Sequence, residues 1–263
     1  MTPKQRIKYI TSWIKNYAKT NNIKNLTVGI SGGIDSSVVS TLCALTGLPV
    51  DVYSMPIHQS KHTHSLSQRH GEWLESKFSN VNFETINLTP TFKQFEKLWG
   101  KQDPLALANS RARLRMMTLY NSAQTSNGIV VGTGNKVEDF GVGFFTKYGD
   151  GGVDISPIGD CLKTEVWDMG RELGILDDII NAAPTDGLWD DHRTDEDQIG
   201  MSYPELERMM AVDILDRSDI PTITGQDWSA ADKKKLKRYR ELRTRNLHKM
   251  NPIPVCMMPK ENQ

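Results

Sequence analysis

Leu26–Ser37 reads LTVGISGGIDSS, and this stretch decides the fold of the chain. An apolar run typical of a buried strand passes through two glycines into the start of a helix. Glycines let a backbone approach a phosphate closely, and the first turn of a helix presents unpaired N–H groups at its positive end. No lysine follows the glycines as in a Walker A motif, so we expect Ser31, Ser36, Ser37 and backbone amides to bind nucleotide phosphates and Asp35 to bind magnesium.

Apolar runs alternate with helix-like segments along the first half of the chain. The runs that predict buried strands are Leu26–Ile30, Val50–Ile57, Val81–Leu88 and Gly128–Gly132. This alternation indicates an α/β protein with a doubly wound parallel sheet flanked by helices. Ligands of such sheets bind beyond the carboxyl ends of the strands, so we expect three loops to face one crevice: Ser31–Ser37, Pro56–His64 and Thr133–Glu138.

Length, charge and cysteine content limit the kind of protein. The 263 residues suffice for one sizeable core, and we expect a single domain over residues 1–263. Lysine plus arginine and aspartate plus glutamate both number 32, which gives no electrostatic case for a nucleic acid or an anionic membrane as partner. The sequence has three cysteines without a CxxC pair, which predicts a cytoplasmic protein. It has no apolar run of about 18 to 20 residues, so we expect no membrane span.

A second turn with polar chemistry follows the Gly128–Gly132 run. Thr133–Asp139 repeats the order of strand, turn and helix and brings a second acidic group near the first. Magnesium bound between phosphate oxygens needs only one or two carboxylates, so Asp35 and Glu138 are sufficient to hold it. Taken alone, Glu138 and Asp139 are also typical acids of a helix start.

Two irregular segments differ in what they predict. Gly143–Asp154 contains four glycines, two phenylalanines, a tyrosine, a lysine and two acids, and this composition favours a functional loop over a plain surface loop. Asp186–Gln198 is charge-rich and predicts a long mobile loop, which is either a solvated connection or a lid over substrate.

A helix predicted over Pro104–Ala123 carries three arginines. At about 100° per residue, Arg111 and Arg115 share one face while Arg113 points nearly opposite. The three side chains therefore cannot share one role.

Together these motifs resemble the ammonia-dependent NAD synthetases of the N-type ATP pyrophosphatase family, over nearly the whole chain. The shared motifs are Gly29–Ser36, Arg111–Met116, Gly132–Lys136, Gly143–Gly152, Thr194–Glu196, Gly200–Tyr203 and the pair His248 and Lys249. The first motif marks the wider superfamily, and the Phe-Phe-Thr-Lys loop singles out NAD synthetases. The resemblance implies an adenine nucleotide alpha hydrolase-like fold and amidation of deamido-NAD to NAD by ammonia. In that reaction the nicotinate carboxylate attacks the α-phosphate of ATP, pyrophosphate leaves, and ammonia then displaces AMP.

The resemblance also implies roles for individual residues. The expected ATP contacts are Gly29, Ile30, Ser31, Gly32, Gly33, Ile34, Asp35, Ser36, Thr133, Lys163 and Thr185. The expected deamido-NAD contacts are Arg113, Lys147, Asp154, His248 and Lys249. The expected catalytic residues are Asp35, Lys163 and Lys147, and Asp35 and Glu138 are expected to hold Mg²⁺. Four residues separate Glu138 from Gly143, where some members have three, so Asp139 stays open as the alternative ligand.

The nitrogen donor and the partners follow from the same resemblance. Glutamine-using relatives carry an additional amidase domain, and only a helix is expected before the first strand here, so we expect free ammonia or ammonia from a separate partner. Members of this length are usually homodimers, and the same is expected here. Two alternatives remain: another adenylating enzyme, such as a GMP synthetase or a tRNA-thiolating enzyme, and a module that binds ATP without cleaving it.

Overall fold

A parallel four-stranded sheet lies at the centre of the part of the chain that the structure describes. The computed structural model describes residues 1–58, 61–185, 194–217 and 228–258, with the backbone alone for 61–64. The sheet order is β3-β2-β1-β4, formed by β1 (Asn25–Ile30), β2 (Val50–Ser54), β3 (Val81–Thr85) and β4 (Gly128–Val130). The predicted α/β class with a parallel sheet is confirmed.

Two strands end earlier than their apolar runs. The run Val50–Ile57 was expected to form one strand, but β2 stops at Ser54, two residues before Pro56. Proline has no N–H to continue a ladder, which explains the end of the strand. The run Val81–Leu88 likewise leaves the ladder after Thr85. β4 is extended by one isolated parallel bridge between Val131 and Ile155.

The strand order creates a switch point between β1 and β4. The chain runs from β1 to β2 and β3 on one side, and then returns to add β4 on the other side of β1. The register pairs Leu26 with both Val50 and Ile129, so the three strands end at one edge. Ligands of doubly wound sheets bind where the strand order reverses. The loops after β1 and β4 are therefore neighbours at the expected crevice.

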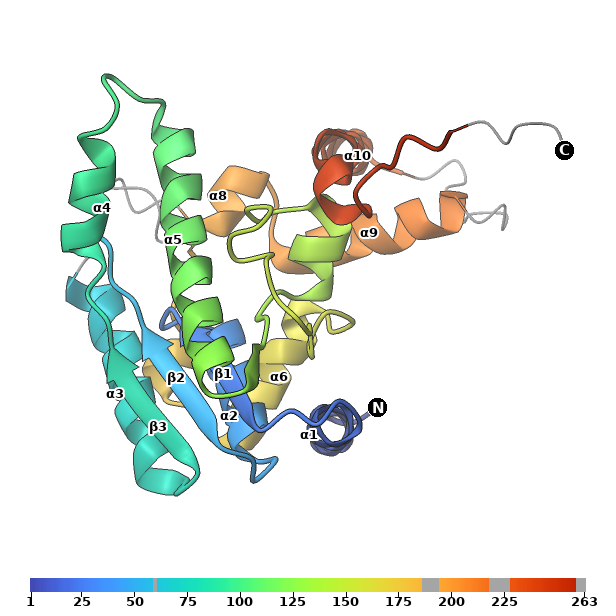
Figure 1. Ribbon diagram of the computed structural model, residues 1–263. Coiled ribbons are helices and arrows are strands. Elements are labelled where there is room, and N and C mark those ends of the chain that lie inside the picture. Colours follow the sequence, from blue (N-terminus) through green and yellow to red (C-terminus); the bar gives the residue numbers. More distant parts are fainter. Residues whose placement is uncertain (59–60, 186–193, 218–227, 259–263) are drawn as a thin grey trace, which may run out of the picture.

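Helices cover both faces of the sheet, as a doubly wound fold requires (Figure 1). One face is covered by α2 and α3, with α1 and α6 packed against α2, and α5 covers the other face beside α4. The bounds are α1 (Pro3–Thr20), α2 (Ile34–Ala44), α3 (Lys61–Lys77), α4 (Thr89–Glu96), α5 (Pro104–Thr125) and α6 (Lys163–Leu173). The helix predicted over Pro104–Ala123 is confirmed as α5. Every α2 residue except Asp35 is buried, which fixes the loop that precedes this helix.

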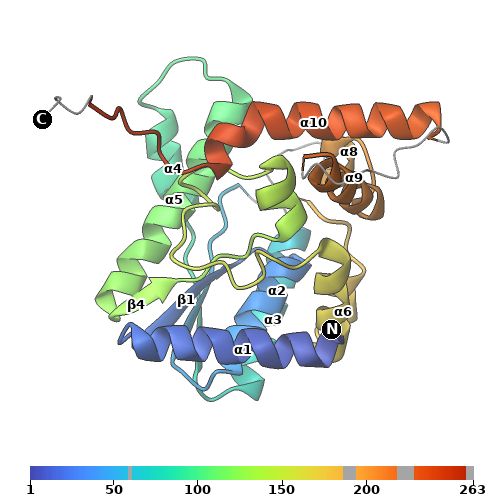
Figure 2. The same cartoon turned by 90° about the vertical axis from the view of Figure 1, so that its right-hand side faces the viewer.

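A second apolar cluster lies on the opposite side of the molecule from α1 (Figure 2). There η1 (Lys136–Val142), a π-helical turn, packs against α9 (Tyr203–Arg217) and α10 (Ala230–Met250). The two short helices are α7 (Asp177–Ile180) and α8 (Asp195–Ile199). The expectation of a loop over Asp186–Gln198 is wrong at its end, because the Thr194 side chain caps α8. The remainder of that loop, residues 186–193, lies outside the described residues.

Neither a membrane span nor a disulfide is found among the described residues. Their helices are all too short or too polar to cross a bilayer. Cys43 and Cys161 are buried and Cys256 is exposed, and all three are free. Cys43 lies in α2 with no exposed surface and packs in the core.

Candidate active site

The loop between β1 and α2 has the geometry of a phosphate cradle. Gly32 adopts φ +87°, a left-handed conformation that glycine accepts without strain. Gly33 is the N-cap of α2 and offers no side-chain hydrogen bond to the first turn, so the N–H groups there keep their capacity to bind an anion. Ser31 and Ser36 brace the loop, since the Ser31 and Ser36 hydroxyls are 3.2 Å apart and Ser36 Oγ donates to the Gly33 carbonyl at 3.1 Å.

Two carboxylates from distant segments meet one buried ammonium group beside this cradle. Lys163 Nζ donates to Asp35 Oδ2 at 2.5 Å and to Glu138 Oε1 at 2.9 Å. The Lys163 side chain is 2% exposed, whereas those of Asp35 and Glu138 are 19% and 15% exposed. The carboxylates therefore keep access to the crevice while the ammonium group lies beneath them. The structure brings together the predicted pair Asp35 and Glu138 and the predicted Lys163.

The ionisable groups of this cluster shift one another's pKa values. Burial raises the pKa of Asp35, the Lys163 ammonium opposes this rise, and the Glu138 carboxylate adds to it. Burial would also raise the pKa of Glu138, but Lys163 and the Tyr203 hydroxyl outweigh burial and hold it below its ordinary value. Burial lowers the pKa of Lys163, yet the two carboxylates reverse this, so the ammonium stays charged. One ammonium group therefore serves two carboxylates in this cluster.

Three residues of this site had no predicted role. Asn135 Nδ2 donates to Asp35 Oδ1 at 3.2 Å, and its Oδ1 accepts from the Val137 and Glu138 amides at the start of η1. The Tyr203 hydroxyl donates to Glu138 Oε1 at 2.5 Å. Asp195 lies on the far side of that hydroxyl, at 3.4 Å. All three stand in the motifs shared with NAD synthetases, so the motifs were a signal, but only the fold shows what they contact.

The start of α6, which carries Lys163, is held from α9. Glu207 accepts the Thr164 N–H and the Thr164 hydroxyl, both at 2.9 Å. Glu165 closes the same turn by accepting the Leu162 N–H at 2.9 Å. These bonds fix the backbone from which Lys163 reaches the two carboxylates.

Asp139, the alternative magnesium ligand, lies differently from Glu138. Its carboxylate packs against Gly134, where an added Cβ would lie 1.8 Å from Asp139 Oδ2. Burial raises the pKa of Asp139 well above its ordinary value, and the carboxylates of Asp150 and Glu138 raise it further. Only Glu138 shares the Lys163 ammonium with Asp35.

Four of the five predicted deamido-NAD residues gather around the glycine-rich loop. Lys147 Nζ donates to the His248 carbonyl at 2.8 Å, and Lys249 Nζ donates to the Phe145 carbonyl at 2.7 Å. Arg113 Nε donates to the Lys147 carbonyl at 3.3 Å. These three bonds brace the glycine-rich loop from α5 and α10.

Asp154, the fifth of these residues, is bound elsewhere. Its Oδ2 accepts the Val130 N–H at 2.7 Å, and its Oδ1 accepts the Tyr120 hydroxyl at 3.1 Å. These contacts tie Asp154 to the edge strand β4. Of the remaining ATP candidates, Thr133 is half-buried and directly follows Gly132. Thr185 is exposed and is the last described residue before the 186–193 segment.

Arg113 and Arg115 contact different parts of the protein, in agreement with their predicted directions on the helix. Arg115 Nε donates to the Met55 carbonyl at 2.9 Å, just beyond the end of β2. Burial lowers the pKa of Arg115 to about 10, with the Arg111 charge acting in the same direction. Arg113 is exposed and reaches the glycine-rich loop instead.

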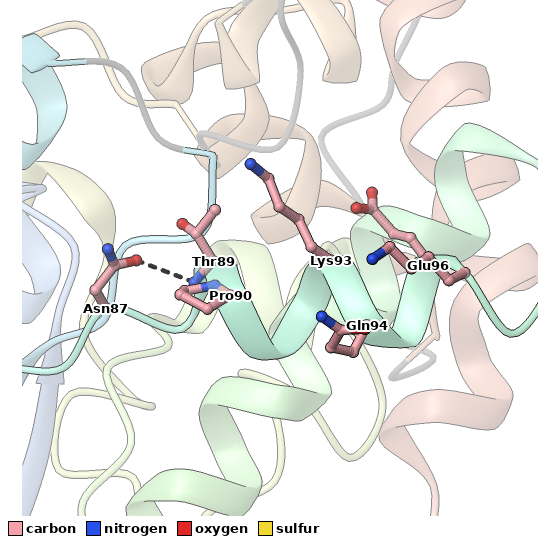
Figure 3. A pocket seen from close by; sticks show the side chains of 7 residues that line it. Asn87, Thr89, Pro90, Lys93, Gln94 and Glu96 are labelled. Carbon is pink, nitrogen blue, oxygen red and sulfur yellow. Dashed lines mark hydrogen bonds between the residues drawn. The ribbon is translucent and has the colours of Figure 1, made fainter.

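An open pocket of about 690 Å³ lies on α4, away from all of these residues (Figure 3). It is lined by Asn87, Thr89, Pro90, Lys93, Gln94, Glu96 and Lys97. None of these side chains belongs to the cradle or to the carboxylate cluster. The cluster of Asp35, Glu138 and Lys163 therefore indicates the candidate site, and this surface pocket does not.

The fold and the site define an α/β protein with the geometry of a phosphate cradle at the switch point of its sheet. Comparison with known proteins then gives the family. The sequence model of the NAD synthase family matches residues 6–253. The NH(3)-dependent NAD(+) synthetase of Mesoplasma florum is 39% identical over 224 residues, 83% of this chain and 88% of the relative. That of Thermoplasma acidophilum is 34% identical over 248 residues, 94% and 95% of the two chains.

A solved structure agrees with the sequence comparison. The NMN synthetase from Francisella tularensis superposes with a TM-score of 0.82 at 32% identity, covering 99% of this chain and 100% of that one. The chain belongs to the NAD synthase family. The expected ammonia-dependent NAD synthetase, an ATP-using ligase with this fold, is thereby confirmed. It replaces the alternatives of a GMP synthetase, a tRNA-thiolating enzyme and a non-catalytic ATP module.

Proposed function

We propose that this site joins ammonia to deamido-NAD through an adenylated intermediate. Asp35, Glu138 and Lys163 lie, in this proposal, beside the bond of ATP that breaks between the α-phosphorus and the pyrophosphate. The observation that carries the proposal is the position of Lys163, whose ammonium gathers both carboxylates beside the cradle. A cradle for phosphates next to paired acids suits the transfer of an adenylyl group from ATP.

Mg²⁺ fits the carboxylates of this site. Asp35 and Glu138 present hard oxygen ligands at the crevice, and both carboxylates are partly exposed. Among the described residues, no group of three or more His, Cys, Asp or Glu forms a metal centre, so the fit rests on this pair. When bound, Mg²⁺ would neutralise triphosphate charge and favour the departure of pyrophosphate.

In the first step, the chain brings two anions together. The first turn of α2 and the Ser31–Ser36 loop bind the phosphates of ATP, and the N–H groups there offset their charge. A nicotinate carboxylate oxygen bonds to the α-phosphorus as the bond to the pyrophosphate oxygen breaks. Lys163 remains charged beneath the two carboxylates and contributes positive charge to the same site.

In the second step, ammonia attacks the adenylated carbonyl carbon. A C–N bond forms, the bond to the AMP oxygen breaks, and a proton is released. No side chain has to become covalently bound, because the substrates supply both nucleophiles. The role of the protein is to position the reactants and to exclude water from the acyl-adenylate.

The deamido-NAD contacts are proposed at the glycine-rich loop. Arg113 approaches that loop from α5, His248 and Lys249 approach it from α10, and Lys147 belongs to the loop itself. The two lysines and Arg113 bring positive charge for an anionic dinucleotide. Asp154 stays in the proposed set, as do Thr133 and Thr185 for ATP. Lys147 is the proposed catalytic residue of this group because its ammonium lies beside the glycine-rich loop, where it donates to the His248 carbonyl.

The domain organisation, the cellular location and the oligomeric state are proposed from the same resemblance. We propose one synthetase domain over residues 1–263, a cytoplasmic location, and a homodimer in solution. Sedimentation velocity of the purified protein tests the dimer, and a monomer at micromolar concentration would contradict it.

Nicotinate mononucleotide is a second candidate acceptor. It is suggested by the NMN synthetase of Francisella tularensis, which matches this chain over its full length. Both acceptors carry the same nicotinate carboxylate, so the chemistry of the cluster is the same for either.

The test is one reaction with a complete product balance. The purified protein is incubated with ATP, Mg²⁺, ammonium and deamido-NAD, and NAD, AMP and pyrophosphate are measured together. Equal yields of all three support the proposal, and no cleavage of ATP would overturn it. A parallel reaction with nicotinate mononucleotide compares kcat/KM for the two acceptors, and another with glutamine in place of ammonium tests the donor.

A further inference from the structure

Tyr203 connects α9 to the carboxylate cluster. Its side chain is 1% exposed, and its hydroxyl donates to Glu138 Oε1 at 2.5 Å. The same oxygen accepts Lys163 Nζ at 2.9 Å. Two donors from two helices therefore converge on one oxygen of Glu138.

The Tyr203 hydroxyl can donate one hydrogen bond, and the two distances show which carboxylate accepts it. Asp195 Oδ2 lies 3.4 Å from the Tyr203 oxygen, much farther than Glu138 Oε1. A phenol donates one hydrogen bond, and the shorter contact takes it.

The ring is held so that the hydroxyl cannot move freely. Trp167 contacts it edge-on, with ring centroids 5.6 Å apart. Lys163 Nζ lies 4.8 Å from the centre of the ring, and the Tyr203 N–H donates to Glu196 Oε1 at 2.9 Å. Tyr203 is therefore held both at its ring and at its backbone.

We infer that Tyr203 is a positioning residue that holds Glu138 in the orientation in which its second oxygen is available to Mg²⁺. This inference rests on the proposed role of Glu138 as a magnesium ligand. A carboxylate bound at Oε1 by two fixed donors has the direction of Oε2 fixed as well. Groups that orient metal ligands in this way commonly change metal affinity when they are removed.

The experiment uses Tyr203→Phe, which removes one oxygen and keeps the ring. Mn²⁺ serves as the probe because it takes the same oxygen ligands as Mg²⁺. Binding of Mn²⁺ is measured by the loss of the free-ion EPR signal, in the presence of an ATP analogue with a methylene group between the α- and β-phosphates. The expected result is affinity for Mn²⁺ reduced about 10-fold or more.

Tyr239→Phe is the matched control. Tyr239 is also fully buried, belongs to the same apolar cluster, and donates its hydroxyl to the Gly141 carbonyl at 3.4 Å. Its removal deletes an equivalent buried hydroxyl without contact to Glu138. Mn²⁺ affinity in Tyr239→Phe is expected to match the wild type.

A double variant shows whether Tyr203 acts through Glu138. If it does, Glu138→Gln combined with Tyr203→Phe binds Mn²⁺ as weakly as Glu138→Gln alone. Independent effects that multiply, or wild-type affinity in Tyr203→Phe, would overturn the inference. Wild-type affinity in Glu138→Gln would instead overturn the proposed metal site and the inference with it. Excess Mn²⁺ should restore ATP cleavage in Tyr203→Phe, which a folding defect would not allow.

Discussion

Lys163 Nζ lies 2.5 Å from Asp35 Oδ2, although 128 residues separate the two in the chain. Asp35 stands in the first turn of α2, and Lys163 is the first residue of α6. The two helices pack side by side, and Gly170 permits their close approach, since a Cβ there would lie 2.6 Å from Ile34 Cδ1. Core packing therefore sets the position of the charged cluster.

Lys163→Met is expected to damage both stability and activity. The change leaves the partly exposed carboxylates of Asp35 and Glu138 without the buried ammonium that both contact. Removing one partner of a buried ion pair costs about 3–5 kcal/mol. Urea unfolding and pyrophosphate release measure the two effects. Lys136→Met is the control, because the ion pair of Lys136 with Asp160 is at the surface and Asp160 is 96% exposed. Equal losses of stability in the two variants would contradict the importance of the buried cluster.

Asp35→Asn is expected to slow adenylation. The amide keeps the size of the side chain but removes the charge proposed to bind Mg²⁺, and losing one electrostatic stabiliser costs about 2–3 kcal/mol or more. The measurement is the rate of pyrophosphate release at saturating ATP and deamido-NAD. A rate equal to that of the wild type would remove Asp35 from the proposed mechanism.

Glu138→Gln and Asp139→Asn are expected to differ in their Mg²⁺ requirement. Glu138 shares Lys163 with Asp35, whereas the Asp139 carboxylate packs against Gly134. The Mg²⁺ concentration that gives half-maximal ATP cleavage should rise in Glu138→Gln and stay near the wild-type value in Asp139→Asn. The reverse order would make Asp139 the ligand.

The sequence predicted the cradle and the strands well because both are local features. The apolar run and the glycines of Leu26–Ser37 determine a strand and a turn whatever the rest of the chain does. The ends of β2 and β3 were less accurate, because an apolar run can continue into the core after the ladder has stopped. Ile57 is buried although it follows the end of β2.

The contacts of the site could be predicted only in part. The resemblance to a known family identified Asp35, Glu138 and Lys163 as site residues. The number of residues between them in the sequence does not say how far apart α2, η1 and α6 lie in space. Tyr203 was part of a shared motif, and its hydroxyl contact with Glu138 depends on how α9 packs. The choice between Glu138 and Asp139 needed the direction of each side chain, which adjacent positions in a sequence do not give.

Arg113→Gln is expected to weaken deamido-NAD binding selectively. Arg113 is exposed and lies at the glycine-rich loop, so its loss should raise KM for deamido-NAD several-fold and leave KM for ATP unchanged. Steady-state kinetics with each substrate varied in turn provides the measurement. Arg69→Gln is the control, since its exposed ion pair with Asp178 lies on another element. An equal rise in both KM values would indicate a structural defect instead.

His70 is expected to make the protein less stable in mild acid. Its ring has no exposed surface, Nε2 lies 3.0 Å from Ser40 Oγ, and burial lowers its pKa from 6.5 to about 4. Between these two values the unfolded chain binds a proton that the folded chain does not, so the free energy of unfolding falls as the pH drops from 6.5 towards 4. The difference between these two pKa values corresponds to about 3 kcal/mol in the free energy of unfolding. Urea unfolding of the wild type and His70→Gln at several pH values isolates this contribution as the difference between the two proteins. That difference should narrow on acidification, because only the wild type loses stability through His70, and a difference independent of pH would show that the ring does not titrate in this way.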